Sequence, residues 1–261
     1  MDVESTIAIV GAATFGLAFG SFLNVCILRL PHEDRKKRSL FYPPSTCPSC
    51  GHLIGWRDNV PVVSWLLLRG RCRWCKTAIS PQYPVIEALV AVLWVIAVLY
   101  YGPNLEALSA ALFGTILLGI AITDARHYII PDEFTFGGLA IGLLLALRGG
   151  TDGLLSALLG AIVGFGLLYA VAVVGKWMFK EDAMGGGDIK MMAMVGAFVG
   201  WKGVLLTIFL GALFGTAIFV PLTLKKKRLV PFGVFLAVGA AVTFFAQDAI
   251  LSWYQRFLSI G

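Results

Sequence analysis

Long apolar runs recur along most of this chain, and they limit its possible folds more than any other feature does. The longest lie at about 7–28, 154–175 and 203–222, and each approaches the roughly 20 residues that cross a bilayer as a helix. A soluble fold could not bury this much apolar surface, because 58% of the residues are hydrophobic and only 14% are charged. Ordinary soluble domains are roughly 25% charged. The sequence therefore predicts an integral membrane protein.

We expect an all-α fold with about eight transmembrane helices. Glycine- and proline-rich turn signals separate the apolar runs. The run at 189–200 is short for a full span, so we expect a short helix whose ends are covered by its neighbours. The expected spans are 7–28, 84–101, 108–123, 134–147, 154–175, 189–200, 203–222 and 231–248.

Basic residues are distributed unevenly and predict the topology. With the N-terminus outside, the cytoplasmic segments are 29–83, 124–133, 176–188 and 223–230, the last of which contains the basic run 225–228. Together with Lys190 they hold 18 of the 21 Lys and Arg residues, which is the bias typical of cytoplasmic loops. The net charge of +6 therefore reflects membrane topology, and we expect no nucleic-acid partner.

Four cysteines lie in the only sizeable soluble segment that we expect. Cys47-Pro48-Ser49-Cys50 is followed, after 21 residues, by Cys72-Arg73-Trp74-Cys75. Two C-x-x-C pairs at about this separation favour a four-thiolate zinc site that resembles a zinc ribbon. Two disulfides or four unrelated thiols are the alternatives, but disulfides need an oxidising compartment. His52 is a possible competing ligand, and Cys26, within the first span, is interpreted as core packing.

Carboxylates at the ends of spans are candidates for function, because ionisable groups are costly in a membrane. Asp124 ends the third span, and Asp188 follows three glycines at the start of the sixth. Two carboxylates held close together share a proton, which provides one general acid and one general base. Alternatively, both are ordinary caps of helix ends. Asp132 and Glu87 are interpreted as acids of first helical turns.

The ordered set of motifs resembles the type IV prepilin peptidases, the bifunctional leader peptidase/N-methyltransferases of bacterial inner membranes. The resemblance extends over nearly the whole chain. Gln82 stands where the family is expected to have Arg, and Thr123 stands where an aliphatic residue is usual. The matching segments are Gly20–Val25, Arg29–Pro31, Cys47–Cys50, Asn59–Pro61, Ser64–Leu66, Leu68–Cys75, Ile79–Pro84, Glu87, Asp124, Ile130–Asp132 and Gly185–Lys190.

This resemblance implies that Asp124 and Asp188 are the catalytic pair and that Gly185 and Gly187 shape the second motif. It also implies removal of a short basic leader from prepilins or pseudopilins at the cytoplasmic face of the inner membrane. Methylation of the new N-terminus from S-adenosylmethionine would follow. No motif marks the methyltransferase pocket.

We therefore expect a first transmembrane helix at 1–28, a cytoplasmic cysteine-rich segment at 29–82 and a membrane aspartic peptidase core at 83–261. Two other functions remain possible. One is an ion-coupled transporter with an aspartate relay, although transporter sites usually lie near the bilayer midplane. The other is a non-enzymatic membrane assembly factor whose zinc-ribbon segment is a docking site.

Overall fold

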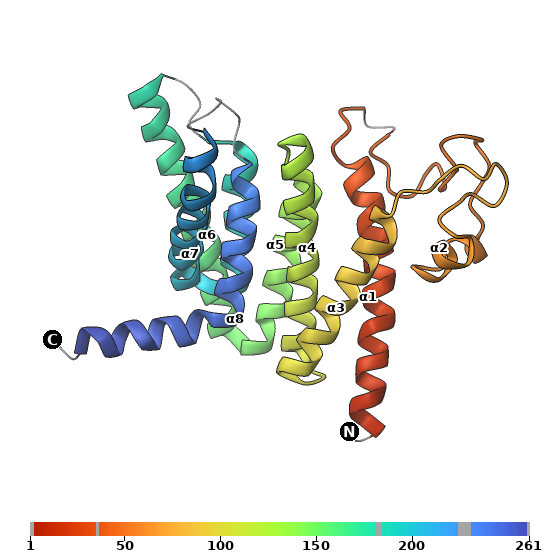
Figure 1. Ribbon diagram of the computed structural model, residues 1–261. Helices are drawn as coiled ribbons and strands as arrows, with labels where there is room; N and C mark the ends of the chain where they lie inside the picture. Colours follow the sequence, from red (N-terminus) through yellow and green to blue (C-terminus); the bar gives the residue numbers. More distant parts are fainter. Residues whose placement is uncertain (1–2, 35–36, 181–183, 224–230, 260–261) are drawn as a thin grey trace. The chain divides into compact units, whose positions relative to one another are not determined.

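The computed structural model describes residues 3–34, 37–180, 184–223 and 231–259 (Figure 1). Within these ranges the regular structure is helical, apart from the isolated bridges Thr46↔Leu53 and Arg71↔Ala78. The expected basic run at 225–228 lies outside the described residues. The helices are α1 (Val3–Arg29), η1 (Trp56–Asp58), α2 (Val63–Leu67), α3 (Gln82–Tyr101), α4 (Leu105–His127), α5 (Asp132–Ala146), η2 (Leu147–Gly149), α6 (Gly150–Phe179), α7 (Gly186–Thr223) and α8 (Phe232–Ser259).

Apolar helices confirm the predicted multi-pass membrane fold. Among the described residues, 6 helical segments are long and apolar enough to cross a membrane. Two of them, Asp132–Phe179 and Gly186–Ile218, each contain two of the eight expected spans. The predicted number of spans therefore fits roughly. The prediction and the structure differ where a glycine-containing break divides one long helical segment into two expected spans.

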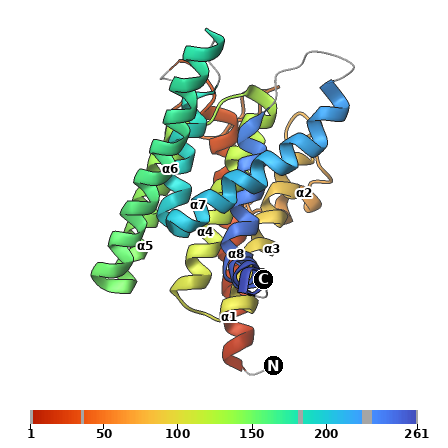
Figure 2. The ribbon, with the colours of Figure 1, turned by 90° about the vertical axis from the view of Figure 1, so that its left-hand side faces the viewer.

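Both breaks depend on glycine. Gly150, with φ 64°, separates η2 from α6. Gly200, with φ 69° and ψ 177°, interrupts α7, a conformation that is essentially restricted to glycine. Figure 2 shows that α7 reverses direction and forms two arms. The short span expected at 189–200 is the first of these arms.

The chain divides into two compact units, Met1–Thr115 and Ile116–Gly261. In the first unit, α1 packs closely on α3. A Cβ atom at Gly16 would lie 2.6 Å from the Cα of Ala91, and one at Gly20 would lie 2.7 Å from the Cα of Glu87. Small residues at these two positions therefore allow the helix backbones to approach each other, as is common in lipid.

In the second unit, glycines bring α6 and the first arm of α7 into backbone contact. Cβ atoms at Gly160 and Gly164 would collide with the carbonyl oxygens of Gly196 and Met192, respectively. Gly196 in turn faces the carbonyl oxygen of Gly160. The small-residue spacing Gly160-x-x-x-Gly164 thus allows close helix packing, as is common in lipid. Met191, Met192 and Met194 are fully buried and pack in the core of this unit.

The membrane helices of the second unit bring several helix ends to one end of this unit. Figure 1 shows the last turn of α4 there, together with the first turns of α5 and α8. The predicted aspartates lie at these helix ends, Asp124 in the last turns of α4 and Asp188 in the first turn of α7.

Candidate functional site

Asp124 is a buried carboxylate at a helix end. Only 6% of the residue is exposed. Its Oδ2 accepts a hydrogen bond from the backbone N–H of Val234 at 3.1 Å, and the Gly233 amide also hydrogen-bonds to the carboxylate. Both amides belong to the first turn of α8, where N–H groups have no partner within the helix and favour an anion. The N-terminus of α8 therefore orients the Asp124 carboxylate.

Gly233 is a site residue that sequence reasoning missed. A Cβ atom at this position would lie 2.9 Å from Oδ2 of Asp124 and 2.7 Å from Cδ1 of Ile130. A side chain at position 233 would therefore require the Asp124 carboxylate or the end of the Ile130 side chain to move. The only sequence signal was a glycine two residues after the turn-forming Pro231, which does not reveal the partner helix.

Asp188 lies in the first turn of α7, after the glycine run. The Gly185 amide hydrogen-bonds to its carboxylate, and the charges of Asp188 and Asp124 interact. A Cβ atom at Gly185 would lie only 3.3 Å from Oδ2 of Asp188. The structure therefore brings the two predicted aspartates into one site, with Gly185 in contact with the second carboxylate.

Ile130 connects the surroundings of the two aspartates. A Cβ atom at Gly187 would lie 2.9 Å from the Cβ of Ile130, and Ile130 also packs against Gly233. Two glycines on different helices thus close around one aliphatic side chain. The segment after α4 thereby links the N-terminus of α7 to that of α8.

Asp132 has a different environment from the pair. It lies in the first turn of α5, as expected, and forms a 2.6 Å ion pair with Lys190. An aspartate that is half exposed and neutralised by a lysine is less suited to proton transfer than two carboxylates whose charges interact. Asp132 thus has a basic partner, Lys190, whereas Asp124 accepts hydrogen bonds from the backbone of α8.

The second site is a cluster of the four predicted cysteines. The Sγ atoms of Cys47, Cys50, Cys72 and Cys75 all lie within 4.8 Å of one another, and those of Cys47 and Cys75 are 3.7 Å apart. Sulfurs in a tetrahedral thiolate site with metal–sulfur bonds of about 2.3 Å are separated by about 3.8 Å. The cluster therefore fits a metal ion.

Two matching loops build the cluster. In the first, the N–H of Gly51 donates to the carbonyl of Cys47 at 2.8 Å. In the second, the N–H of Lys76 donates to the carbonyl of Cys72 at 3.1 Å. Gly51 and Lys76 have φ values of 70° and 59°, so each loop turns through the left-handed region. The His52 ring lies tilted against Trp74, with centroids 4.1 Å apart, and His52 is not part of the four-sulfur cluster.

The thiols perturb one another's ionisation. Hydrogen bonding with the side chain and the backbone of Thr77 lowers the pKa of Cys75 to about 6. A hydrogen bond from the His52 backbone opposes it, yet burial and the neighbouring thiols raise the pKa of Cys50 to about 11. Four thiolates at this separation would repel one another unless a cation lay between them. The electrostatics of the cluster therefore agree with its geometry.

Glu87 joins the cysteine-rich segment to the membrane helices of the first unit. It is buried in α3, and its Oε2 accepts the N–H of Val62 at 2.7 Å. Asn24 links α1 to the start of the same helix, since its Nδ2 donates to the carbonyl of Tyr83 at 3.1 Å. The interpretation of Glu87 as a first-turn acid is wrong, because α3 begins at Gln82 and has no acidic residue in its first turn. The anchoring role was missed because a single sequence does not reveal a contact 25 residues away.

Comparison with known proteins identifies two adjacent family regions. Residues 14–101 match the Bacterial Peptidase A24 N-terminal domain, which contains the cysteine cluster. Residues 111–220 match the Type IV leader peptidase family, which contains both aspartates. No solved structure matches the chain.

Curated relatives cover almost the full length of the chain. A prepilin leader peptidase/N-methyltransferase of Aeromonas salmonicida (strain A449) is 34% identical over 265 residues, which cover 92% of this chain and 91% of the relative. The protein of the same name from Neisseria gonorrhoeae is 33% identical, with 97% of each chain covered. The match to the Myxococcus xanthus protein is 37% identical and covers 83% of this chain and 63% of the relative. The chain therefore belongs to the type IV prepilin leader peptidase/N-methyltransferase family, as its motifs predicted.

Proposed function

We propose that this protein is a membrane aspartic endopeptidase in which Asp124 and Asp188 form the catalytic pair. Its substrates would be prepilins or pseudopilins, from which it removes the short basic leader at the cytoplasmic face of the bacterial inner membrane. One observation carries this proposal: a buried Asp124 is held by the N-terminus of α8 and interacts with Asp188. The names of the curated relatives support the substrate class.

The chemistry requires one ionised and one protonated carboxyl group. The ionised carboxylate removes a proton from water, and the water oxygen then attacks the peptide carbonyl carbon. The protonated carboxyl group gives its proton to the carbonyl oxygen. When the tetrahedral intermediate collapses, the C–N bond breaks and the leaving nitrogen takes a proton from the pair. The α8 amides contribute by fixing the orientation of the Asp124 carboxylate.

The glycine motif gives the substrate backbone access to the pair. Gly185 is exposed and has only the carboxylate of Asp188 near its Cβ position. Without a side chain there, an extended peptide can approach that carboxylate closely. Glycine at position 187 is explained by packing instead, because Ile130 occupies the space that a side chain would need.

We assign one structural zinc ion to Cys47, Cys50, Cys72 and Cys75. Thiolate ligands and tetrahedral spacing suit zinc, and a small segment between two membrane helices gains folding energy from a metal. In this proposal residues 1–28 are the first span, 29–82 the cytoplasmic segment and 83–261 the peptidase core. Purified protein should contain about one zinc per chain, and elemental analysis of Cys47→Ser or Cys72→Ser should show its loss. Wild-type protein without metal and with paired, oxidised thiols would refute the assignment.

The second activity is N-methylation of the new N-terminus with S-adenosylmethionine as the methyl donor. The curated relatives carry this activity in their names. The same names favour the peptidase over the transporter and the assembly factor. Both aspartates also lie at helix ends, whereas transporter sites usually lie near the midplane.

Both activities can be tested in one reaction. The purified enzyme is incubated in detergent with a full-length prepilin and S-adenosylmethionine, and mass spectrometry reads the N-terminus of the product. The proposal predicts loss of the basic leader and addition of a methyl group to the new N-terminal nitrogen. Without S-adenosylmethionine the product should be cleaved but unmethylated. An intact prepilin would contradict the proposed function.

A further inference from the structure

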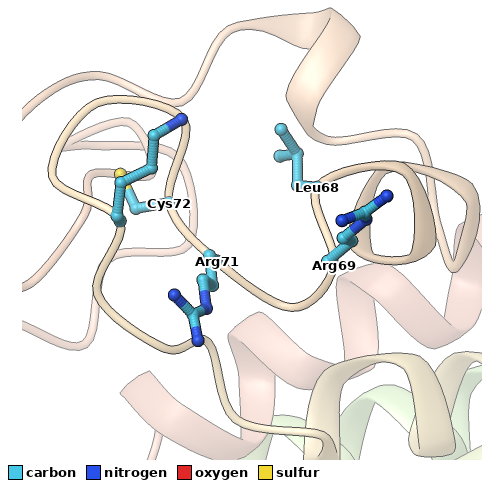
Figure 3. A pocket seen from close by; sticks show the side chains of 5 residues that line it. Leu68, Arg69, Arg71 and Cys72 are labelled. Carbon is cyan, nitrogen blue, oxygen red and sulfur yellow. The ribbon is translucent and has the colours of Figure 1, made fainter.

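The cysteine-rich segment contains a cavity lined by cations. Its volume is about 460 Å³, and its lining residues are Leu68, Arg69, Arg71, Cys72 and Lys76. Figure 3 shows Leu68 and Arg69 on one side, Cys72 across from them and Arg71 between. The three basic side chains are exposed, and no carboxylate contributes to this lining. A cavity with this lining attracts an anion and repels a basic leader peptide.

An apolar helical surface lies immediately before the cavity in the chain. The short helix α2 exposes Val63, Leu66 and Leu67, of which Leu67 is 79% exposed. Removal of these aliphatic side chains from water would be favourable, so they are suited to contact with lipid. Leu66 and Leu67 directly precede the cavity residues of 68–76 in the chain. Leu68 is both the C-cap of α2 and part of the cavity lining, so the exposed end of α2 adjoins the cavity.

The position of α2 places this surface at the level of the membrane boundary. The N–H of Val62, directly before α2, donates to Glu87, which lies five residues into the membrane helix that begins at Gln82. At about 1.5 Å per residue this contact lies roughly 7 Å along the span. The Trp65 indole, bound to the carbonyl of Ile79 at 3.2 Å, fixes the other side of α2. Figure 1 shows α2 beside α1 and α3 rather than beyond their ends.

We propose that this surface is a binding site for anionic phospholipids of the surrounding leaflet. The cavity formed by Leu68, Arg69, Arg71, Cys72 and Lys76 binds the headgroup phosphate, and Leu66 and Leu67 contact the acyl chains. Charge complementarity carries the assignment, because anionic lipids attract basic residues beside membrane helices, and apolar side chains at the interface strengthen such binding. The site is separate from the proposed peptidase pair and holds the cysteine-rich segment on the membrane.

A lipid cross-linking experiment tests the proposal. The full-length protein carries a photoreactive amino acid at Leu67 and is reconstituted in nanodiscs of phosphatidylcholine with about a third phosphatidylglycerol. After illumination, mass spectrometry counts the lipids attached at that position. We expect phosphatidylglycerol at several times its share of the bilayer. The pocket variant Arg69→Gln/Arg71→Gln should reduce this ratio to the share of the bilayer.

A matched control removes equal charge elsewhere in the segment. Arg57→Gln/Arg38→Gln should keep the phosphatidylglycerol enrichment, and bound metal in both variants shows that the segment is folded. If both variants lost the phosphatidylglycerol enrichment equally, the proposed site would be overturned, since any basic residue of the segment would then attract the lipid. Cross-links to protein only, or no enrichment in the wild type, would overturn it as well. Displacement of the lipid by inorganic phosphate or S-adenosylmethionine would assign the cavity to a soluble ligand instead.

Discussion

Gly51 is the residue at which the first Cys-x-x-Cys loop turns back on itself. Its φ of 70° lies in the left-handed region, and the equivalent position of the second loop is Lys76 at φ 59°. A residue with a Cβ atom adopts this conformation at a cost of roughly 1–2 kcal/mol. The first loop avoids that cost and the second does not, so a side chain at position 51 would add the cost to the first loop as well.

Gly51→Ala should therefore weaken metal binding through backbone strain alone. No atom lies within 4 Å of the Cβ position, so a steric clash does not contribute. We expect metal affinity to fall about tenfold, as roughly 1–2 kcal/mol implies, measured by competition with a chelator. Gly55→Ala is the matched control, because Gly55 has open space and φ −70°. Equal affinity of the two variants would show that the loop conformation does not matter.

At the residue scale, spacing predicted the ligands and the aspartates but not their partners. Cys-x-x-Cys is local, so the sequence alone indicated the four-sulfur cluster. Asp124 stood out as a charge at the end of an apolar run. Its contact with Val234, 110 residues away, depends on helix packing that a single sequence does not encode in any local pattern. Gly233 and Glu87 were missed for this reason.

At the scale of elements, the contact between α6 and α7 supports the candidate site. Gly160 and Gly196 face each other's carbonyl oxygens, and Asp188 lies about two turns before Gly196 on the same helix. Displacement of α7 would therefore move the aspartate. Apolar runs predicted both helices, and turn signals predicted the break before α6, whereas the role of Gly200 in the break of α7 was not predicted. The short helices η1 and α2 were not predicted, because they are shorter than a recognisable period.

Gly160→Ala should destabilise the second unit. The new methyl group would collide with backbone atoms of α7, which cannot rotate away as a side chain would, and overpacking of this kind costs about 1–3 kcal/mol. We expect the unfolding temperature in detergent to fall by about 5 °C, with a parallel loss of cleavage activity. Gly166→Ala, in the same helix but with open space, should leave both unchanged. An equally stable Gly160→Ala protein would contradict the packing account.

At the scale of the whole molecule, the membrane topology determines which side of the membrane each loop faces. Basic residues predict that the segment between α6 and α7 is cytoplasmic, whereas the turn between η2 and α6 is outside. A cytoplasm-active reporter fused after Lys180 should therefore be active, and the same reporter fused after Gly150 should be inactive. The reverse pattern would exclude the proposed orientation. The all-α class and the approximate span count were predictable from composition and run length, since lipid leaves few alternatives to helices.

The central claim is that Asp124 and Asp188 act as one catalytic pair, and prepilin cleavage by purified variants tests it most directly. Asp124→Asn and Asp188→Asn keep size and most hydrogen bonding but remove acid–base function. Each should lower the cleavage rate about a thousandfold or more, and the double variant should be little worse. The wild-type pH profile should be bell-shaped, because the pair titrates as a unit.

Asp132→Asn is the matched control, since Asp132 pairs with Lys190 outside the pair and should retain most activity. Cleavage rates are measured for all four variants with the same full-length prepilin, after membrane insertion and bound metal have been verified. The account predicts that only the variants at Asp124 and Asp188 are inactive. Folded Asp124→Asn or Asp188→Asn protein that cleaves prepilin at near wild-type rate would contradict it.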